Sequence, residues 1–320
     1  MHKKPLISII IPVYNREKLL AFTLNSIIQQ SFVDWECIIV DDQSTDGTFL
    51  VMQQYQILDS RIKIYSRPFQ LRKGANSCRN YGFLQTNGTY IKWFDSDDIM
   101  LPMHLEICYN TLINNDLDFV VTDTINFDNE THKFLDKPYN FDRFKSIITA
   151  DQFAKSQIGW ITDDFTGKRV LVEQLKFNET ITTDGDEYNF FVRMLHVSNK
   201  GIFIDKILTN RRIHEKSLSE LYGQGTSNYF SKIATIKFQT AQDLVIYKDK
   251  NLIRWFLSGY MHYSFELALE KEPIPFFKSA FKMISVYFSL SNSLAFLSAL
   301  FFAKYFNKGY NIMKFARALK

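Results

Sequence analysis

Apolar runs and amphipathic segments alternate through the first 114 residues, and this alternation constrains the fold more than any other feature of the chain. The run Leu6–Val13 is apolar and rich in β-branched residues, which is typical of a strand covered on both faces. In Arg16–Gln30 the apolar residues recur on one helical face. The pattern repeats, with strands predicted over Trp35–Val40, Ile62–Tyr65 and Tyr90–Phe94, and helices over Phe49–Leu58, Asn76–Gln85 and Met103–Asn114. This order predicts an α/β fold with a mostly parallel sheet, right-handed crossovers and flanking helices.

Polar residues follow three of the predicted strands. They are Tyr14 and Asn15 after the first strand, Asp41 and Asp42 at the end of the second, and Asp95, Asp97 and Asp98 after the fourth. Ligands bind parallel sheets at the carboxyl ends of the strands, so we expect these side chains to meet at one edge of the sheet. The sequence therefore predicts a binding site at that edge.

The segment Asp95–Asp98 places three carboxylates within four residues. Like charges this close repel one another unless a cation lies among them. Carboxylate oxygens without His or Cys suit Mg²⁺ or Mn²⁺ rather than Zn²⁺, and such an ion can neutralise charge on a departing diphosphate. The simpler alternative is a solvated acidic turn that caps the helix Met103–Asn114. The position after a buried strand, facing two other polar strand ends, favours the site.

Other residues near the predicted edge suit a nucleotide. The Asp42 carboxylate can accept a hydrogen bond from the imide N–H of uracil, and Tyr14 can stack on the base, although an aromatic at a strand end is more often part of a core. Lys73 and Gly74 precede the helix that carries Arg79, and a cation and a glycine at a helix start suit a diphosphate. Arg79 taken alone could equally be a surface residue.

A second acidic segment, Asp184–Tyr188, lies at the start of a helix predicted over Asp186–His196. Transfer of a group to a hydroxyl needs a base, and a partly buried carboxylate such as Asp186 or Glu187 can act as one. The alternative is that these acidic residues stabilise the positive end of the helix dipole. The residues alone do not separate the two interpretations.

Four motifs, Ile9–Asn15, Val40–Thr48, Arg79–Gly82 and Phe94–Asp98, occur together in an order and spacing that resembles the family 2 glycosyltransferases. The resemblance covers residues 6–110 and is weaker over 184–217. It implies the GT-A fold, a Rossmann-like nucleotide-sugar-binding sheet, here followed by a C-terminal helical appendage. It also implies an inverting hexosyltransferase that moves a sugar from a nucleotide diphosphate donor, a UDP-sugar, to an acceptor hydroxyl in surface polysaccharide or glycolipid biosynthesis.

The resemblance also implies roles for single residues of this chain. Donor-binding residues would be Pro12, Tyr14, Asn15, Asp42, Arg79, Asp95 and Asp98, with Pro12, Tyr14 and Asp42 on the nucleoside, Arg79 on the diphosphate, Asp95 on the ribose side and Asp98 beside a sugar. Mn²⁺ or Mg²⁺ would be held by Asp97, Asp95 and His214, the first two belonging to a DXD motif.

The proposed base and the last proposed metal ligand depart from a simple match. The family's base lies in a Glu-Asp pair followed by an aromatic, whereas this chain has Asp186-Glu187-Tyr188. By position Glu187 matches the base and Asp186 its neighbour. Arg212, His214 and Ser217 resemble the family's closing strand, and a hydrogen-bonded structural histidine is the alternative for His214.

The remainder of the chain has a less regular pattern. The segment 123–183 is irregular, two short strands are predicted over Gly201–Ile204 and Leu208–Ile213, and the pattern is helical beyond residue 225. We therefore predict a catalytic domain over 1–222, with a nucleotide-binding half (1–110) and an acceptor half (111–222). A helical, aromatic-rich, basic region follows over 223–320.

The last fifty residues, 271–320, hold eight Lys or Arg, one Glu and twelve Phe or Tyr. Met283–Ala303 has no charged residue and approaches the ~20 apolar residues of a membrane span. However, the polar run Ser289–Ser293 lies at its centre, which favours two amphipathic helices joined by a turn. Aromatics with cations suit a helix on an anionic membrane surface, and packing on the protein or on a partner subunit is the alternative.

Several classes of protein and compartment are disfavoured. The net charge of +4 is too small to indicate a nucleic-acid partner. Three cysteines without a CxxC pair indicate neither zinc nor disulfides, and Pro12 interrupts the N-terminal apolar run, so we expect a cytoplasmic protein. The resemblance implies a glycan or lipid-linked glycan acceptor, and with the basic, aromatic C-terminal helices this favours a peripheral position on the inner face of the cytoplasmic membrane.

Three other activities are weighed against sugar transfer. A sugar-1-phosphate nucleotidylyltransferase and a dinucleotide-dependent oxidoreductase both need a glycine-rich loop after the first strand, which this chain lacks. A catalytically impaired nucleotide-sugar-binding protein stays open because the acidic pair at Asp186-Glu187 is reversed.

Overall fold

The computed structural model describes residues 4–181, 185–214 and 226–318, except for the side chain of Asp186. Two compact units divide the chain. The first comprises Met1–Thr182 and Phe190–His214, and the second comprises Thr183–Asn189 and Glu215–Lys320. The predicted boundary between residues 222 and 223 lies outside the described residues.

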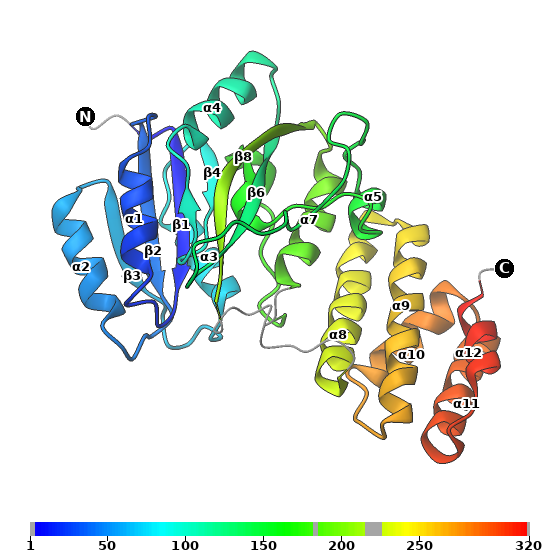
Figure 1. The fold of residues 1–320 in the computed structure, drawn as a ribbon. Helices are drawn as coiled ribbons and strands as arrows, with labels where there is room; N and C mark the ends of the chain where they lie inside the picture. Colours follow the sequence, from blue (N-terminus) through cyan, green and yellow to red (C-terminus); the bar gives the residue numbers. More distant parts are fainter. Residues whose placement is uncertain (1–3, 182–184, 215–225, 319–320) are drawn as a thin grey trace. The chain divides into compact units, whose positions relative to one another are not determined.

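An eight-stranded sheet forms the centre of the first unit (Figure 1). Its strands are β1 (Ile7–Val13), β2 (Trp35–Asp41), β3 (Ile62–Ser66), β4 (Tyr90–Trp93), β5 (Ile99–Met100), β6 (Phe119–Asp128), β7 (Phe165–Lys168) and β8 (Gly201–Ile213), in the order β3-β2-β1-β4-β7-β6-β8-β5. β1 pairs in parallel with β2 and β4, β2 with β3, and β6 with β8. β7 is antiparallel to both of its neighbours, and β5 is antiparallel to β8. The predicted mostly parallel sheet is confirmed.

Helices cover both faces of this sheet because successive side chains of the buried strands point to opposite sides. Alternate residues of β1, such as Ile9 and Ile11, pack with α1 (Leu20–Ile28), α2 (Thr48–Leu58) and α4 (His104–Asn114). On the other face, α3 (Ala75–Leu84) packs through Cys78 against β2. Phe190 of α7 (Asp186–Val197) also lies there, with its ring 5.0 Å from that of Trp93.

Part of the sheet departs from the predicted pattern. The two short strands predicted near the end of the first unit form one strand, β8, because Asp205 and Lys206 stay in the strand at an irregularity. There β6 advances by two residues, from Val121 to Asp123, while β8 advances by four. The two charged side chains point to solvent, so the polar interruption in the sequence marks a bulge rather than a strand end. β6 and β7, with the short helices α5 (Ala150–Ala154), η1 (Thr162–Asp164) and α6 (Arg169–Val172), occupy segments for which no element was predicted.

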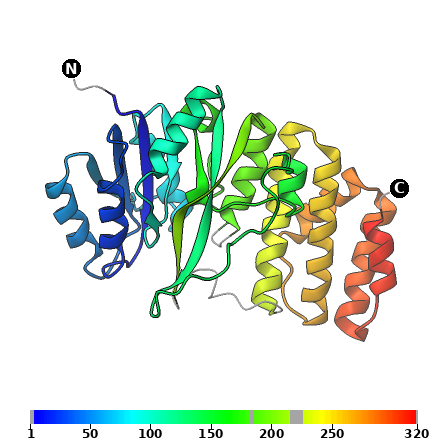
Figure 2. The ribbon, with the colours of Figure 1, turned by 45° about the horizontal axis from the view of Figure 1, so that its top comes forward.

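The described part of the second unit outside α7 is helical (Figure 2). It contains α8 (Ser227–Asp243), η2 (Leu244–Tyr247), α9 (Lys250–Leu269), α10 (Phe277–Tyr287), α11 (Leu290–Phe306) and α12 (Tyr310–Arg317). The predicted pair of C-terminal helices corresponds to α10 and α11. Ser289 caps α11, since its hydroxyl accepts a hydrogen bond from the Asn292 N–H, so the polar residues at the centre of the apolar run begin a helix. Among the described residues, none of the helices combines the length and the hydropathy that a bilayer crossing requires.

Gly82 lets α3 lie close to the sheet, which yields a testable prediction. A Cβ atom on Gly82 would lie 2.7 Å from Ile10 Cγ2 and 3.1 Å from Val40 Cγ2, and both neighbours are β-branched and stiff. Alanine improves helix propensity by about 1 kcal/mol, but overpacking costs about 1–3 kcal/mol. We expect Gly82→Ala to lower the free energy of unfolding by about 1–2 kcal/mol, measured by urea denaturation.

The matched control is Leu84→Ala on the same helix, where the side chain is exposed. It should change stability by less than about 0.5 kcal/mol. A Gly82→Ala protein as stable as the wild type would show that α3 has room to move away from the sheet.

Candidate functional site

The centre of the candidate site is the junction between β4 and β7. These strands pair antiparallel, with Tyr90 opposite Lys168 and Ile91 opposite Gly167. The residues that follow β4 therefore meet the residues that precede β7. Asp95 lies just beyond β4, and Asp163 lies in η1 just before β7. The Asp95 N–H donates a 2.8 Å hydrogen bond to Asp163 Oδ1, which joins the two segments.

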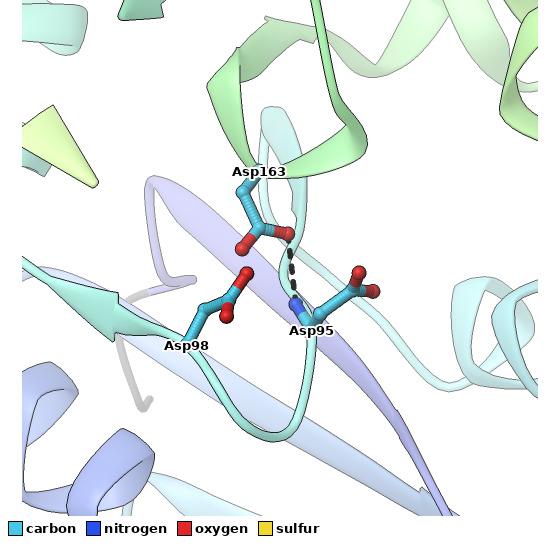
Figure 3. Close-up of side chains that lie close together, drawn as sticks. All are labelled: Asp95, Asp98 and Asp163. Atoms are coloured by element: carbon cyan, nitrogen blue, oxygen red, sulfur yellow. Dashed lines mark hydrogen bonds between the residues drawn. The ribbon is translucent and has the colours of Figure 1, made fainter. Parts of the chain in front are cut away.

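Three carboxylates gather at this junction: Asp95, Asp98 and Asp163, with one oxygen of each within 4.8 Å of the others. The side chains of Asp98 and Asp163 point toward each other, and the Asp95 carboxylate lies beside them (Figure 3). Asp163 is fully buried and Asp98 is 2% exposed, whereas the Asp95 side chain is 40% exposed. The group is thus open to solvent on the side of Asp95.

Two of these carboxyl groups are in an unfavourable environment when ionised. Burial, together with the neighbouring carboxylates, raises the pKa of both Asp98 and Asp163 well above the usual carboxyl value. Among the described residues, no side-chain nitrogen of Lys, Arg or His lies within 4.0 Å of either carboxylate, and Asp163 Oδ2 has no hydrogen-bond donor. The buried Lys92 ammonium lies nearby but donates to the Asp163 backbone carbonyl.

This donor set fits a hard divalent cation. It offers carboxylate oxygens alone, one of them buried without a donor, and Mg²⁺ and Mn²⁺ prefer such ligands. Asp163 and Asp98 are the buried members, and Asp95 is the exposed member.

Asp97 has different partners from its three acidic neighbours. Its Oδ2 accepts hydrogen bonds from Arg16 Nε at 2.9 Å and from His214 Nε2 at 3.0 Å. Burial raises the pKa of Asp97, but the His214 and Arg16 contacts outweigh burial and lower it. The structure therefore brings the sequence-predicted ligands Asp97 and His214 into contact, while Asp95 groups with Asp98 and Asp163.

The residues predicted to hold the nucleoside lie at the ends of β1 and β2. The buried Asp42 carboxylate forms an ion pair with Arg67 Nε, and the Arg67 side chain is also buried. The Tyr14 ring is 38% exposed, and Lys73 Nζ lies 3.9 Å from its centroid. Pro12 is buried within β1, opposite Val40 of β2. Tyr14 thus offers a half-open aromatic face at this edge of the sheet.

Asn15 has a local structural role in this loop. Its backbone is left-handed, with φ of 49°. Its Oδ1 accepts a 2.8 Å hydrogen bond from the Thr45 N–H, and its own N–H donates to Ser44 Oγ at 2.9 Å. Asn15 therefore ties the loop after β1 to the loop after β2.

Arg79 connects α3 to the acidic group. Its Nη2 donates to Asp95 Oδ1 at 3.0 Å, and its Nη1 donates to Asn76 Oδ1 at 3.3 Å. The helix begins after Gly74, whose φ of 138° suits glycine. A buried guanidinium is thus held beside the exposed carboxylate of the group.

The predicted base segment belongs to the second unit. Asp184 and the side chain of Asp186 lie outside the described residues, as does Ser217 of the predicted closing strand. Glu187 is half-buried in the first turn of α7. No distance between this segment and the acidic group is defined, since the two lie in different units.

Sequence reasoning missed four residues that contact the site, namely Arg16, Arg67, Lys92 and Asp163, and it noted Arg212 only as part of the predicted closing strand. The Arg212 N–H donates to Asp98 Oδ1 at 2.8 Å, and the Arg212 guanidinium donates to the Asp97 backbone carbonyl. The one signal for Asp163 was the adjacent pair of carboxylates Asp163-Asp164, in a segment without a strand or helix pattern. The pairing of β7 with β4, which brings Asp163 to the site, joins residues more than about seventy positions apart, and no local pattern reveals it.

Comparisons with known proteins bear on this geometry. The model of the family "Glycosyl transferase family 2" matches residues 8–171, just over half of the chain. The chain is 33% identical over 115 residues to the UDP-Glc:alpha-D-GlcNAc-diphosphoundecaprenol beta-1,3-glucosyltransferase WfgD of Escherichia coli, covering 36% of this chain and 44% of that protein. It is 27% identical over 290 residues to the GalNAc(5)-diNAcBac-PP-undecaprenol beta-1,3-glucosyltransferase of Campylobacter jejuni, covering 88% and 89%.

Among solved structures, Staphylococcus aureus TarS 1-349 in complex with UDP-GlcNAc is similar to this chain with a TM-score of 0.69 at 17% identity. The match covers 98% of this chain and 90% of that one, and it shows a common fold. The chain spans less than half of the length of the E. coli relative and of several further curated glycosyltransferases. Since the family model and the sheet topology agree, this chain belongs to glycosyl transferase family 2 and has the GT-A fold.

Proposed function

We propose that this chain is an inverting, metal-dependent glycosyltransferase that moves a sugar from a UDP-sugar to an acceptor hydroxyl in polysaccharide or glycolipid biosynthesis. The observation that supports this most is the group Asp95, Asp98 and Asp163, which gathers buried carboxylates without a basic partner for Asp98 or Asp163 among the described residues. A cation is the simplest means of making that group stable when it is ionised. The family membership of the chain supports the same reaction class.

The loops after β1 and β2 suit the nucleoside. Arg67 holds the Asp42 carboxylate in one orientation, in which its second oxygen can accept the imide N–H of a uracil. Tyr14 offers an aromatic face for stacking, and Lys73 beside it adds a positive charge for the diphosphate. The names of the E. coli relative and of the TarS complex include UDP-Glc and UDP-GlcNAc, which supports a UDP-sugar as the donor.

The acidic group and its neighbours suit the diphosphate. Asp95, Asp98 and Asp163 would hold Mn²⁺ or Mg²⁺, with Asp97 and His214 adjacent. The ion, when bound, would neutralise negative charge on the departing diphosphate. Arg79 adds a fixed positive charge beside Asp95, and Arg16 keeps Asp97 in place.

Glu187 is the proposed base. It would take the proton of the acceptor hydroxyl while that oxygen bonds to the anomeric carbon. The bond from the anomeric carbon to the phosphate oxygen breaks at the same time, and UDP leaves with the electron pair. One displacement of this kind inverts the configuration. Asp186 is the alternative base, since the order of the acidic pair is reversed.

We further propose that the acceptor is a lipid-linked glycan and that the protein is cytoplasmic and peripheral on the membrane. Both relatives described above are named for undecaprenol-linked substrates. The exposed face of α11 supports this location. Its apolar residues recur at intervals of three and four, at Leu290, Leu294, Leu297, Phe301 and Tyr305. The opposite face, with Phe296 and Leu300, packs on α9 and α12.

Charge around that face favours an anionic surface as the partner. No Asp or Glu occurs after Glu272, whereas Lys304 in the last turn of α11 and Lys308 just after that helix are both exposed. Cations that flank an exposed apolar stripe suit the headgroup region of an anionic membrane.

The first prediction from this proposal concerns turnover. The protein with Mn²⁺ should release UDP from UDP-glucose or UDP-N-acetylglucosamine in the presence of GlcNAc-diphosphoundecaprenol, measured by a coupled UDP assay. Glu187→Gln keeps the shape but removes the base, so kcat should fall about 10²–10⁴-fold with the donor KM little changed. Unchanged turnover would move the base to Asp186, and no turnover with any nucleotide sugar that binds would favour a catalytically impaired binding protein.

The second prediction concerns the cation. In EDTA, Asp163→Asn removes one charge from a crowded group, and its amide oxygen can still accept from the Asp95 N–H. We expect the melting temperature to rise by about 2–4 °C. Mn²⁺ should stabilise the wild type in proportion to its binding, and this increment should fall by at least half in Asp163→Asn.

Asp116→Asn is the control, because this exposed carboxylate pairs with Lys200 at the surface. Its Mn²⁺ increment should equal that of the wild type. An undiminished increment in Asp163→Asn would remove Asp163 from the cation site.

The third prediction concerns the membrane. The double variant Phe301→Ser, Tyr305→Ser removes two exposed rings from α11, and burying one such side chain is worth roughly 1.5–3 kcal/mol. Co-sedimentation with vesicles of phosphatidylglycerol and phosphatidylcholine should weaken by a factor of about ten or more, and added salt should weaken it further.

Ile57→Ser, Leu58→Ser is the matched control, since both side chains are exposed on α2 in the other unit. It should sediment like the wild type. If both double variants bind vesicles as well as the wild type, the α11 face is not the membrane contact.

A further inference from the structure

We propose that helix α8 positions the proposed base, Glu187. The two main contacts that do so are made by Lys237 of α8 and by Asn189 of α7. This inference rests on the proposed function, because it takes Glu187 as the base. The segment Thr183–Asn189 belongs to the same compact unit as α8 and α9. Residues on both sides of Glu187 contact α8, so that helix determines where the carboxylate of Glu187 can lie.

Asn189 provides the polar contact. It is fully buried, and its Nδ2 donates to Thr240 Oγ1 at 3.2 Å and to Asp243 Oδ2 at 3.0 Å. Both acceptors lie on α8, three residues apart, and therefore on one face of it. The two bonds lock the amide of Asn189 against the last two turns of α8.

Gly185 provides the steric contact on the other side of Glu187. A Cβ atom at Gly185 would lie 2.1 Å from Ile236 Cδ1, so a larger residue here would require the Ile236 side chain to move. Ile236 lies four residues before Thr240 and shares its face. Gly185 and Asn189 thus hold both ends of the turn that carries Glu187 against the same stripe of α8.

Lys237 contacts Tyr188, the residue that follows the proposed base. Its Nζ lies 3.5 Å from Tyr188 Oη and 3.9 Å from the centroid of the Trp255 ring. The Tyr188 ring also meets Phe256 of α9 edge to face, with centroids 6.0 Å apart. Tyr188, the residue next to Glu187, is therefore held between α8 and α9 by a cation and an aromatic ring.

Stability alone does not account for a lysine at this position. Among the described residues, no carboxylate lies within 4.0 Å of Lys237 Nζ, and burial lowers the pKa of this ammonium to about 8. Taking an ammonium without a carboxylate partner out of water opposes folding, and an apolar side chain of the same length would avoid that cost. A structural role for Lys237 therefore predicts that an apolar replacement lowers the melting temperature. A positioning role predicts that it lowers kcat without lowering the melting temperature.

The test is Lys237→Met, assayed as UDP release from UDP-glucose with Mn²⁺ and GlcNAc-diphosphoundecaprenol. Misplacement of a catalytic group by about 1 Å can cost about 10²-fold in rate, so we expect kcat to fall about 10–100-fold. The donor KM should stay within about twofold, since donor residues lie in the first unit. The melting temperature should stay equal or rise. Lys237→Arg, which keeps the cation over Trp255, should restore most of kcat.

Two further variants complete the test. Asn189→Ala should lower kcat in the same way, with some loss of stability because Asp243 loses a donor. Lys250→Met, the same exchange at an exposed position of α9, should leave kcat and KM unchanged. On the Glu187→Gln background, Lys237→Met should have no additional effect on kcat, because the base that it positions is already absent.

The outcomes separate the inference from the proposed function. If Glu187→Gln is inactive but Lys237→Met keeps wild-type kcat, the positioning role is wrong and the transferase function stands. If Lys237→Met lowers kcat and the melting temperature together, or lowers kcat equally on the Glu187→Gln background, the role is structural and the inference is overturned. If Glu187→Gln is fully active, both the base assignment and the inference fail.

Discussion

The interaction on which the first unit depends is the meeting of like charges at the end of β4. The antiparallel pairing of β4 with β7 brings Asp163 to the loop that holds Asp95 and Asp98. Burial at this junction makes ionisation costly for Asp98 and Asp163, and the pKa of each is raised accordingly. A fold that buries such a group gains nothing in stability from it. The arrangement therefore supports the proposal that a cation binds here.

The basic residues around this junction pair with aspartates other than the buried Asp98 and Asp163. Arg16 and His214 pair with Asp97, Arg67 pairs with Asp42, and Arg79 reaches only the exposed Asp95. Lys92, although buried nearby, donates to a backbone carbonyl. Paired aspartates are held in fixed orientations by these contacts, whereas Asp98 and Asp163 have no basic partner among the described residues. Asp42, Asp95 and Asp97 are thus fixed by basic partners, and Asp98 and Asp163 are the carboxylates that the proposed cation would neutralise.

The sequence predicted the strands and helices of residues 7–114 well, apart from the two-residue strand β5, because each is a local pattern. Buried parallel strands such as β1 are continuous apolar runs, and their polar ends identify the binding edge. Asp163 could not be predicted in this way, since η1 and β7 span three and four residues and become part of the site only through long-range pairing. The strand β8 was divided in two for a related reason, because Asp205 and Lys206 look like a strand end although they lie at a bulge. The local chemistry could be predicted from the sequence, but the contacts that join distant segments could not.

The second unit shows how a segment with weak sequence signals can still matter for chemistry. A reversed acidic pair at Asp186-Glu187 changes side-chain length by one methylene group at the proposed base, so the backbone that carries it must be placed to match. Contacts on both sides of Glu187, from Gly185 to Ile236 and from Asn189 to Asp243, supply that placement within the unit. These contacts involve a glycine, an amide and a lysine that has no carboxylate partner among the described residues, and none of the three forms a motif. On this proposal, the position of the proposed base depends on residues about fifty positions away, where a pattern of apolar residues predicts only a helix.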